Sequence, residues 1–102
     1  MDLKEKIIKQ ITENKVILFM KGTKEMPMCG FSSTVVNILN MHNIEYEAVN
    51  VLEDPNIRIN LSEHSNWPTI PQFFIKGELV GGCDIMLELH KSGELKNLIE
   101  KA

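Results

Sequence analysis

Basic charge, cysteine and long apolar segments are all scarce in this chain of 102 residues. Eleven Lys and Arg stand against 14 Asp and Glu, for a formal net charge of −3. This balance gives no support for a nucleic-acid partner or an anionic membrane surface. No apolar run approaches the roughly 20 residues of a membrane span, and the charged first six residues lead directly into a helical pattern. We therefore expect neither nucleic acid nor a membrane among its partners.

There are only two cysteines, Cys29 and Cys83, and they are not closely spaced. This usage is typical of a reducing compartment and not of a disulfide-stapled secreted protein. We therefore expect a cytoplasmic location, or an organelle matrix if a transit peptide has been removed. With 43% hydrophobic and 25% charged residues, the chain is long enough for one domain over residues 1–102 but not for two. No repeat, linker or low-complexity segment divides it.

Apolar periodicity predicts five helices and four strands. The first two strands, 16–20 and 46–51, are joined through a helix and should therefore be parallel. The last two, 72–75 and 78–81, form a hairpin with Gly77 in the turn. The predicted helices cover about 2–13, 31–42 and 55–63, then a fourth that follows residues 81–84 and ends at Ser92-Gly93, and a last short helix around 95–99. This order predicts an α/β fold, a small mixed sheet with helices on both faces.

Two prolines mark local structure. Asp54 and Pro55 are typical of an N-cap and of the first position of a helix. Pro71, directly before a strand, is a candidate for a cis peptide bond, although only about 5–6% of X-Pro bonds are cis.

Cys29 follows the loop Lys21-Gly22-Thr23-Lys24-Glu25-Met26-Pro27-Met28 and stands where a helix should begin. Unpaired backbone amides and the helix dipole favour an anion at such a position. A nearby cation such as Lys21 adds to this effect, so we expect the pKa of Cys29 to be lowered. The alternative, an ordinary buried cysteine, is less favoured because Gly30 leaves the position open.

Ser32 stands where a two-cysteine redox helix would carry its second cysteine. Cys29 must therefore act with another molecule, with Cys83 or with a metal.

On these residues the chain resembles the monothiol glutaredoxins of the Cys-Gly-Phe-Ser class. The resemblance rests on motifs that occur in the family's order and spacing, namely Lys21-Gly22-Thr23, Pro27-Met28-Cys29-Gly30-Phe31-Ser32, Arg58, Trp67-Pro68-Thr69-Ile70-Pro71-Gln72, Gly77 and Gly81-Gly82-Cys83-Asp84. It covers nearly all of the chain and implies a thioredoxin-like fold, a four-stranded mixed sheet flanked by about five helices.

The resemblance also implies two ligands, glutathione and a dimer-bridging 2Fe–2S cluster. Cys29 would bind the cluster together with the partner's cysteine and two glutathione thiols, since iron–sulfur clusters take four thiolates. Lys21 and Arg58 would face the glycine carboxylate of glutathione, and the backbone of Ile70 its cysteinyl unit. The amides of Cys83 and Asp84 would bind its γ-glutamyl carboxylate, with the Asp84 side chain near the ammonium group. Taken singly, Lys21 and Arg58 also fit solvated surface charges, and Asp84 a plain helix N-cap.

The implied function is iron–sulfur cluster transfer or assembly, with a homodimer when the cluster is bound and a monomer without it. Apo iron–sulfur proteins and a BolA-like protein are the candidate partners. The alternative is an enzyme, a glutathione-dependent thiol-disulfide oxidoreductase that deglutathionylates proteins with Cys29 as nucleophile. A weaker third reading is an adaptor whose cluster reports iron status. The missing resolving cysteine favours the carrier.

Other residues carry less specific expectations. Cys83 is a second redox partner of Cys29 or, as we favour, a small residue that contributes its backbone amide. Trp67 is expected in the core or at its rim, and the methionines as core filler. The three histidines, His42, His64 and His90, show no ligand spacing and are expected at the surface.

Overall fold

A computed structural model of the chain describes residues 1–102 and contains the five helices and four strands that the sequence predicts. In chain order they are α1 (Leu3–Glu13), β1 (Val16–Met20), α2 (Gly30–Met41), β2 (Glu47–Asn50), the short 3₁₀ helix η1 (Val51–Glu53), α3 (Pro55–Ser65), β3 (Gln72–Ile75), β4 (Glu78–Gly81), α4 (Cys83–Ser92) and α5 (Glu94–Lys101).

The four strands form one mixed sheet in the order β2-β1-β3-β4. Strand β1 pairs parallel with β2, where Leu18 lies opposite Ala48, and antiparallel with β3, where Leu18 lies opposite Phe73. Strands β3 and β4 form the predicted antiparallel hairpin, with Gly77 at φ +83° in its turn. The expected mixed α/β sheet is therefore confirmed.

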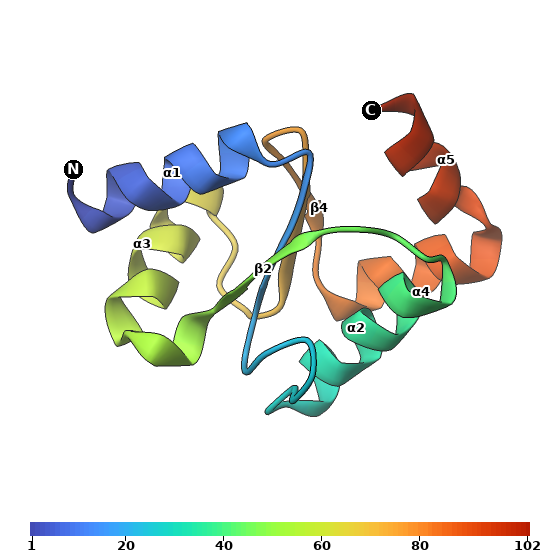
Figure 1. Cartoon of the computed structure of the whole chain (residues 1–102), viewed down its shortest axis with the longest axis horizontal. Coiled ribbons are helices and arrows are strands. Elements are labelled where there is room, and N and C mark those ends of the chain that lie inside the picture. The colour runs from blue at the N-terminus through green and yellow to red at the C-terminus, as the bar shows by residue number, and fades with distance from the viewer.

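Helices cover both faces of this sheet. In Figure 1, α1 and α3 lie on one side, α2 and α4 on the other, and α5 packs beyond α4. Every residue of β1 is buried, and its side chains alternate between the two faces. Leu18 and Met20 join the core under α2 and α4, whereas Ile17 and Phe19 join the core under α1 and α3. The apolar run of β1 thus supplies both cores, because successive strand residues point in opposite directions.

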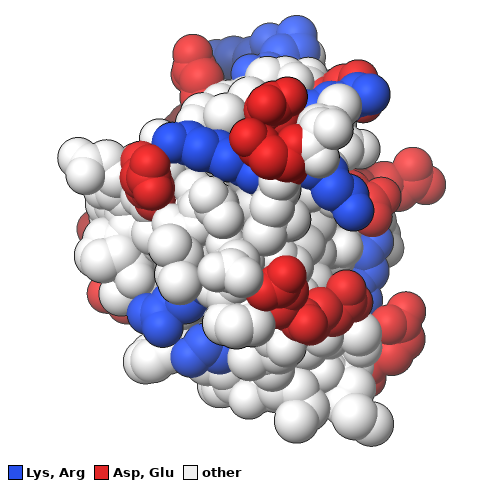
Figure 2. All heavy atoms as spheres, turned by 90° about the vertical axis from the view of Figure 1, so that its left-hand side faces the viewer, with Lys and Arg blue, Asp and Glu red and all other residues white.

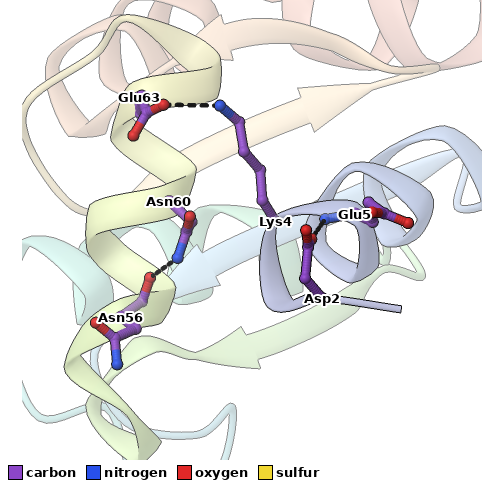
Figure 3. Close-up of polar contacts among 6 residues, drawn as sticks. All are labelled: Asp2, Lys4, Glu5, Asn56, Asn60 and Glu63. Carbon is purple, nitrogen blue, oxygen red and sulfur yellow. Dashed lines mark hydrogen bonds and ion pairs between the residues drawn. The ribbon is translucent and has the colours of Figure 1, made fainter.

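Side-chain caps fix the starts of α1 and α3. Asp2 accepts the backbone N–H of Glu5 at 2.8 Å (Figure 3). Asp54 accepts the N–H of Asn56 at 2.9 Å with Pro55 at the first helical position, as predicted. The two helices are also joined on the outer surface, where Lys4 Nζ lies 2.7 Å from Glu63 Oε1 (Figure 3). Such an exposed pair contributes little, about 0–1 kcal/mol.

Two expectations are corrected by the structure. The second strand, predicted over 46–51, covers Glu47–Asn50. It ends at Asn50 because the Asn50 side chain accepts the N–H of Leu52 at 3.0 Å and starts η1. The methionines are not generally core filler: Met20 and Met86 are fully buried, but the other four, Met1, Met26, Met28 and Met41, are more than 60% exposed.

The face of the molecule that lies on the left-hand side of Figure 1 has no uniform charge. Acidic and basic side chains are interspersed there around an uncharged central area (Figure 2). None of the helices is both long enough and apolar enough to cross a bilayer.

Candidate functional site

Cys29 is the N-cap residue of α2, with extended backbone at φ −153° and ψ 139°. It directly follows the segment of residues 21–28, here called the cysteine loop, which leaves the end of β1. The side chain is partly exposed. The expected position of a thiol at a strand-to-helix junction is therefore confirmed.

The cysteine loop is folded back on itself by backbone hydrogen bonds. Met28 N–H donates to the Lys21 carbonyl at 2.8 Å, and Gly22 forms an antiparallel bridge with Pro27. Gly22 has φ +93°, and its N–H donates to the Asn50 side chain at 2.9 Å. A Cβ at Gly22 would collide with the backbone of Met26 and Met28. The loop therefore needs glycine here to hold Cys29 at the start of the helix.

A second contact, through Lys24, joins the loop to residues before β2. The Nζ atom of Lys24 donates to the carbonyl oxygen of Tyr46 and lies 4.0 Å from the centre of the Tyr46 ring. The loop is thus anchored at the Gly22 end by Asn50 and along its length by Tyr46.

The first turn of α2 lowers the pKa of Cys29 below its ordinary value of 9.0. The largest cause is the backbone N–H of Ser32; the N–H of Phe31, the charge of Lys21 and the Ser32 hydroxyl act in the same direction, against the desolvation of the thiol. The pKa shift therefore has the predicted direction and comes mainly from the open helix N-terminus. Lys21 contributes, but it is not the main cause.

Beside the cysteine lies a groove of about 400 Å³. It is lined by Phe31 from α2, the segment before β3 and the start of α4, that is by Phe31, Trp67, Thr69, Ile70, Pro71, Gly82, Cys83, Asp84 and Ile85. Three of the predicted glutathione-binding residues, Ile70, Cys83 and Asp84, are brought together here although they come from two separate parts of the chain.

The wall of the groove before β3 is held by Gln72, which is fully buried. Its side-chain amide donates to the carbonyl of Trp67 at 2.9 Å and to that of Thr69 at 3.1 Å. The peptide bond between Ile70 and Pro71 is cis, as predicted. Gln72 therefore fixes the backbone that leads into the groove.

The opposite wall is the N-terminus of α4. Its N-cap is Gly82, which makes no side-chain cap, so the first backbone amides of the helix are left for a ligand. A Cβ at Gly82 would lie 3.1 Å from the Pro71 carbonyl and 3.5 Å from the Trp67 indole nitrogen. A side chain here would be tight against the Pro71 carbonyl, which would have to shift by a few tenths of an ångström, so glycine favours the close approach of the two walls.

Cys83 is a free cysteine and partly buried. Burial raises the pKa of its thiol above 9.0, as do the charges of Asp84 and Cys29, while a hydrogen bond with the Thr34 side chain acts in the opposite direction. The two thiols therefore lie close enough to influence each other, yet their environments shift their pKa values in opposite directions.

The remaining predicted residues, Lys21 and Arg58, do not line the groove. Lys21 directly follows β1 and acts on the cysteine through its charge. Arg58 lies on α3 and its Nη2 atom donates to the Pro68 carbonyl at 3.3 Å. The two cations thus flank the site from different elements, and only Lys21 acts on the thiol.

Three contributors to the site were missed by sequence reasoning. Trp67, expected in the core or at its rim, lines the groove, and its indole N–H is buried without a partner. Ser32 is fully buried, and its hydroxyl accepts the backbone N–H of Lys21 at 3.1 Å. Gln72 supports the groove wall. The sequence signal that could have indicated their roles was a polar group next to an apolar or glycine-rich motif.

Comparison with known proteins decides the family. A sequence profile of the glutaredoxin family matches residues 16–80. A monothiol glutaredoxin of Synechocystis, described as uncharacterized and ycf64-like, is 54% identical over 99% of this chain and 94% of its own. The chain belongs to the monothiol glutaredoxins.

Solved structures agree with this glutaredoxin's fold. Reduced apo GrxS14 of poplar is 55% identical, with a TM-score of 0.83 over 97% of this chain and 91% of its own. A buckwheat glutaredoxin–glutathione complex is 24% identical, with a TM-score of 0.85 over 97% of this chain and 88% of its own, a likeness of fold alone. The thioredoxin fold predicted for this glutaredoxin is thus confirmed.

Proposed function

We propose that this glutaredoxin binds glutathione and carries a 2Fe–2S cluster between two copies of the chain, for delivery to apo iron–sulfur proteins. The ligands are Cys29 of each copy and the thiols of two glutathione molecules. The observation that carries the proposal is the site of Cys29, a partly exposed thiol with a lowered pKa at an open helix N-terminus beside a groove.

The donor set of the chain fits a shared cluster and not one enclosed by a single chain. No group of three or more His, Cys, Asp or Glu side chains is arranged to hold a metal. The other thiol, Cys83, is partly buried and has a raised pKa, so it is a poor thiolate donor. A cluster that needs four thiolates must therefore take ligands from other molecules.

The groove suits glutathione, a tripeptide with two carboxylates and one ammonium group. The uncapped amides at Cys83 and Asp84 favour a carboxylate, and the exposed Asp84 side chain favours an ammonium group nearby. Lys21 and Arg58, at the edges of the site, favour the second carboxylate. The buckwheat relative of the same fold is described as a glutathione complex.

The surface around Cys29 suits a second copy. Met26, Met28 and Phe31 are each more than 60% exposed although they are large and apolar. Apolar side chains gathered around a site mark contact surfaces. Two copies meeting through this surface would bring their Cys29 thiols together around the cluster and would exclude water from it. A BolA-like protein in place of one copy stays a prediction.

A second function is favoured by the same exposed thiolate. Cys29 Sγ can attack the glutathione sulfur of a protein–glutathione mixed disulfide, so that the protein leaves as a thiolate and the glutathione becomes disulfide-bonded to Cys29. A second glutathione thiolate then attacks the glutathione sulfur of this new disulfide, which releases Cys29 and oxidised glutathione. This chemistry needs no second cysteine, which agrees with Ser32 three residues after Cys29.

Anaerobic reconstitution with iron, sulfide and glutathione tests the carrier function. The wild-type chain should develop the visible absorption of a 2Fe–2S cluster, at about one cluster per two chains. Cys29→Ser should lose it, because a hydroxyl is a much harder ligand than a thiolate. Cys83→Ser is the matched control and should keep it, since only its backbone amide is assigned to glutathione.

A glutathione-disulfide reductase assay on the same samples separates the two functions. Cluster assembly with weak turnover supports the carrier. Strong turnover without cluster assembly would replace it by the oxidoreductase, and normal assembly in Cys29→Ser would contradict the ligand assignment.

A further inference from the structure

His42 and His90 contact each other across two helices. Nε2 of His42 lies 3.0 Å from Nδ1 of His90, and the rings meet edge to face with centroids 5.2 Å apart. Both side chains are partly buried. Because the histidines show no ligand spacing, the sequence predicts surface residues, and for His42 and His90 this expectation is corrected: they are 48 positions apart but in contact and partly buried. The packing of α2 against α4 on the same face of the sheet brings them together (Figure 1).

His42 Nε2 and His90 Nδ1 are hydrogen-bonded to each other, so the rings must rotate to turn both lone pairs toward one metal ion. If the rotation keeps their separation, the distance between the two nitrogens suits such an ion. Imidazole nitrogens lie about 2.1 Å from a metal, so two nitrogens 3.0 Å apart subtend about 90° at an ion bound to both. Tetrahedral coordination would need about 3.4 Å between them. An angle near 90° is the preference of tetragonal Ni²⁺ and Cu²⁺ sites built from nitrogen and oxygen ligands.

The backbone at this position also favours a cation. His42 is the C-cap of α2, and His90 lies in the last turn of α4. The C-terminal end of a helix carries partial negative charge from its unpaired carbonyl groups, which stabilises positive charge nearby. The negative ends of two helices therefore lie near this one pair of imidazoles.

An ion can reach the pair from its His42 side, since His90 does not line the neighbouring cavity. His42 lines a surface cavity of about 430 Å³ together with Lys15, Glu45, Lys96 and Glu100. These two cations and two carboxylates balance, so they give no net repulsion. No third His, Cys, Asp or Glu completes a metal-binding group, so water from the cavity would fill the remaining coordination positions.

We propose that His42 and His90 form a binding site for one divalent transition-metal ion of tetragonal preference, Ni²⁺ or Cu²⁺. In the hydrogen bond between the rings, one of the two facing nitrogens carries a proton. Metal binding needs both as lone-pair donors, so that proton moves to the other nitrogen of its own ring, and no proton is lost. The site lies at the C-terminal end of α2, about 20 Å from Cys29 at its N-cap. It is therefore independent of the proposed cluster site.

Calorimetric titration with Ni²⁺ tests the proposal on the untagged full chain. Ni²⁺ is preferred as the probe because free thiols reduce Cu²⁺. Cys29→Ser/Cys83→Ser is the parent in every titration, so that thiols do not compete for the metal. We expect one site per chain, and a higher midpoint of thermal unfolding with Ni²⁺ because the ion binds the folded state.

In this parent, His42→Phe and His90→Phe keep a ring for packing but remove a ligand. Each should weaken Ni²⁺ binding by more than about tenfold, since even the outer partners of metal ligands are worth about 10–100-fold. His64→Phe is the matched control, because His64 is exposed and also lies in the last turn of a helix, α3, but has no second histidine. It should bind as the parent does.

NMR locates the ion independently of affinity. The signals of His42 and His90 should shift or broaden on addition of Ni²⁺, and those of His64 should not. The proposal is overturned if the parent binds no Ni²⁺, if the His42 and His90 variants bind as tightly as the parent, or if His64→Phe loses binding as they do.

Discussion

The buried hydroxyl of Ser32 accepts a hydrogen bond from the backbone N–H of Lys21 at 3.1 Å. This contact ties the residue after β1 to the first turn of α2, on either side of the cysteine loop. The backbone N–H of the same serine is also the strongest influence on the pKa of Cys29. One residue thus fixes the loop and stabilises the thiolate.

The substitution Ser32→Ala should therefore have two effects. It leaves the Lys21 N–H without its partner, which should lower the free energy of unfolding by about 1–3 kcal/mol. It should also raise the pKa of Cys29, because the hydroxyl contributes to the lowering. Denaturant unfolding and an alkylation-rate titration measure the two effects. Ser33→Ala is the matched control, and an equal effect there would remove the special role of Ser32.

The pKa values of the two thiols should lie on opposite sides of 9.0. Cys29 has a lowered pKa and Cys83 a raised one, so alkylation followed by peptide mass spectrometry should modify Cys29 at lower pH. Ionisation of Cys29 also adds stability, which is complete above pH 9.0 and is lost as the pH falls through its folded pKa. The pH dependence is the opposite for Cys83, whose contribution to stability is lost as the pH rises through its folded pKa.

Lys21→Ala should raise the pKa of Cys29, but it should leave that pKa below 9.0, because the backbone N–H of Ser32 remains. Lys24→Ala serves as the control, since Lys24 is in the same loop but contacts Tyr46. The same alkylation titration compares the variants. An unchanged pKa in Lys21→Ala would make Lys21 a bystander.

Gly22→Ala should disrupt the cysteine loop. Its φ of +93° is costly for any other residue, and the added Cβ would overlap the backbone of Met26 and Met28. We expect the free energy of unfolding to fall by more than about 1–2 kcal/mol. Gly30→Ala is a matched control in the same site, since no atom lies within 4 Å of its added Cβ. It should change stability by no more than about 1 kcal/mol; equal losses in both variants would contradict the steric argument.

Asp84→Asn should weaken glutathione binding by about two- to fivefold, as expected for an exposed ion pair worth up to about 1 kcal/mol. Added salt should weaken binding to the wild type and have less effect on the variant. Glu88→Gln, on the same helix but outside the groove, should bind as the wild type does. Calorimetry with reduced glutathione measures all three proteins, and an unaffected Asp84→Asn would remove the carboxylate from the site.

Local sequence signals predicted the elements but not all of their contacts. The apolar run of β1, the Asp54-Pro55 helix start and the glycines around the β3–β4 hairpin are local features, so the sequence shows them directly. The position of Cys29 follows from the same kind of signal, a strand, a proline-bearing loop and a helix.

Contacts between distant residues were beyond such signals. Gly22 and Asn50 are 28 positions apart, and His42 and His90 are 48 apart, so only the packed fold defines these pairs. The sequence also did not reveal which apolar residues are exposed. Helical spacing predicts that Phe31 lies on α2, but it does not show that the side chain faces solvent beside Cys29.

If two chains share one cluster through the thiols of two glutathione molecules, native mass spectrometry of the anaerobically reconstituted protein should show it. We expect a mass of two chains, one 2Fe–2S cluster and two glutathione molecules, which falls to single chains when glutathione is removed. A cluster held by one chain, or a cluster-containing dimer that persists without glutathione, would contradict it.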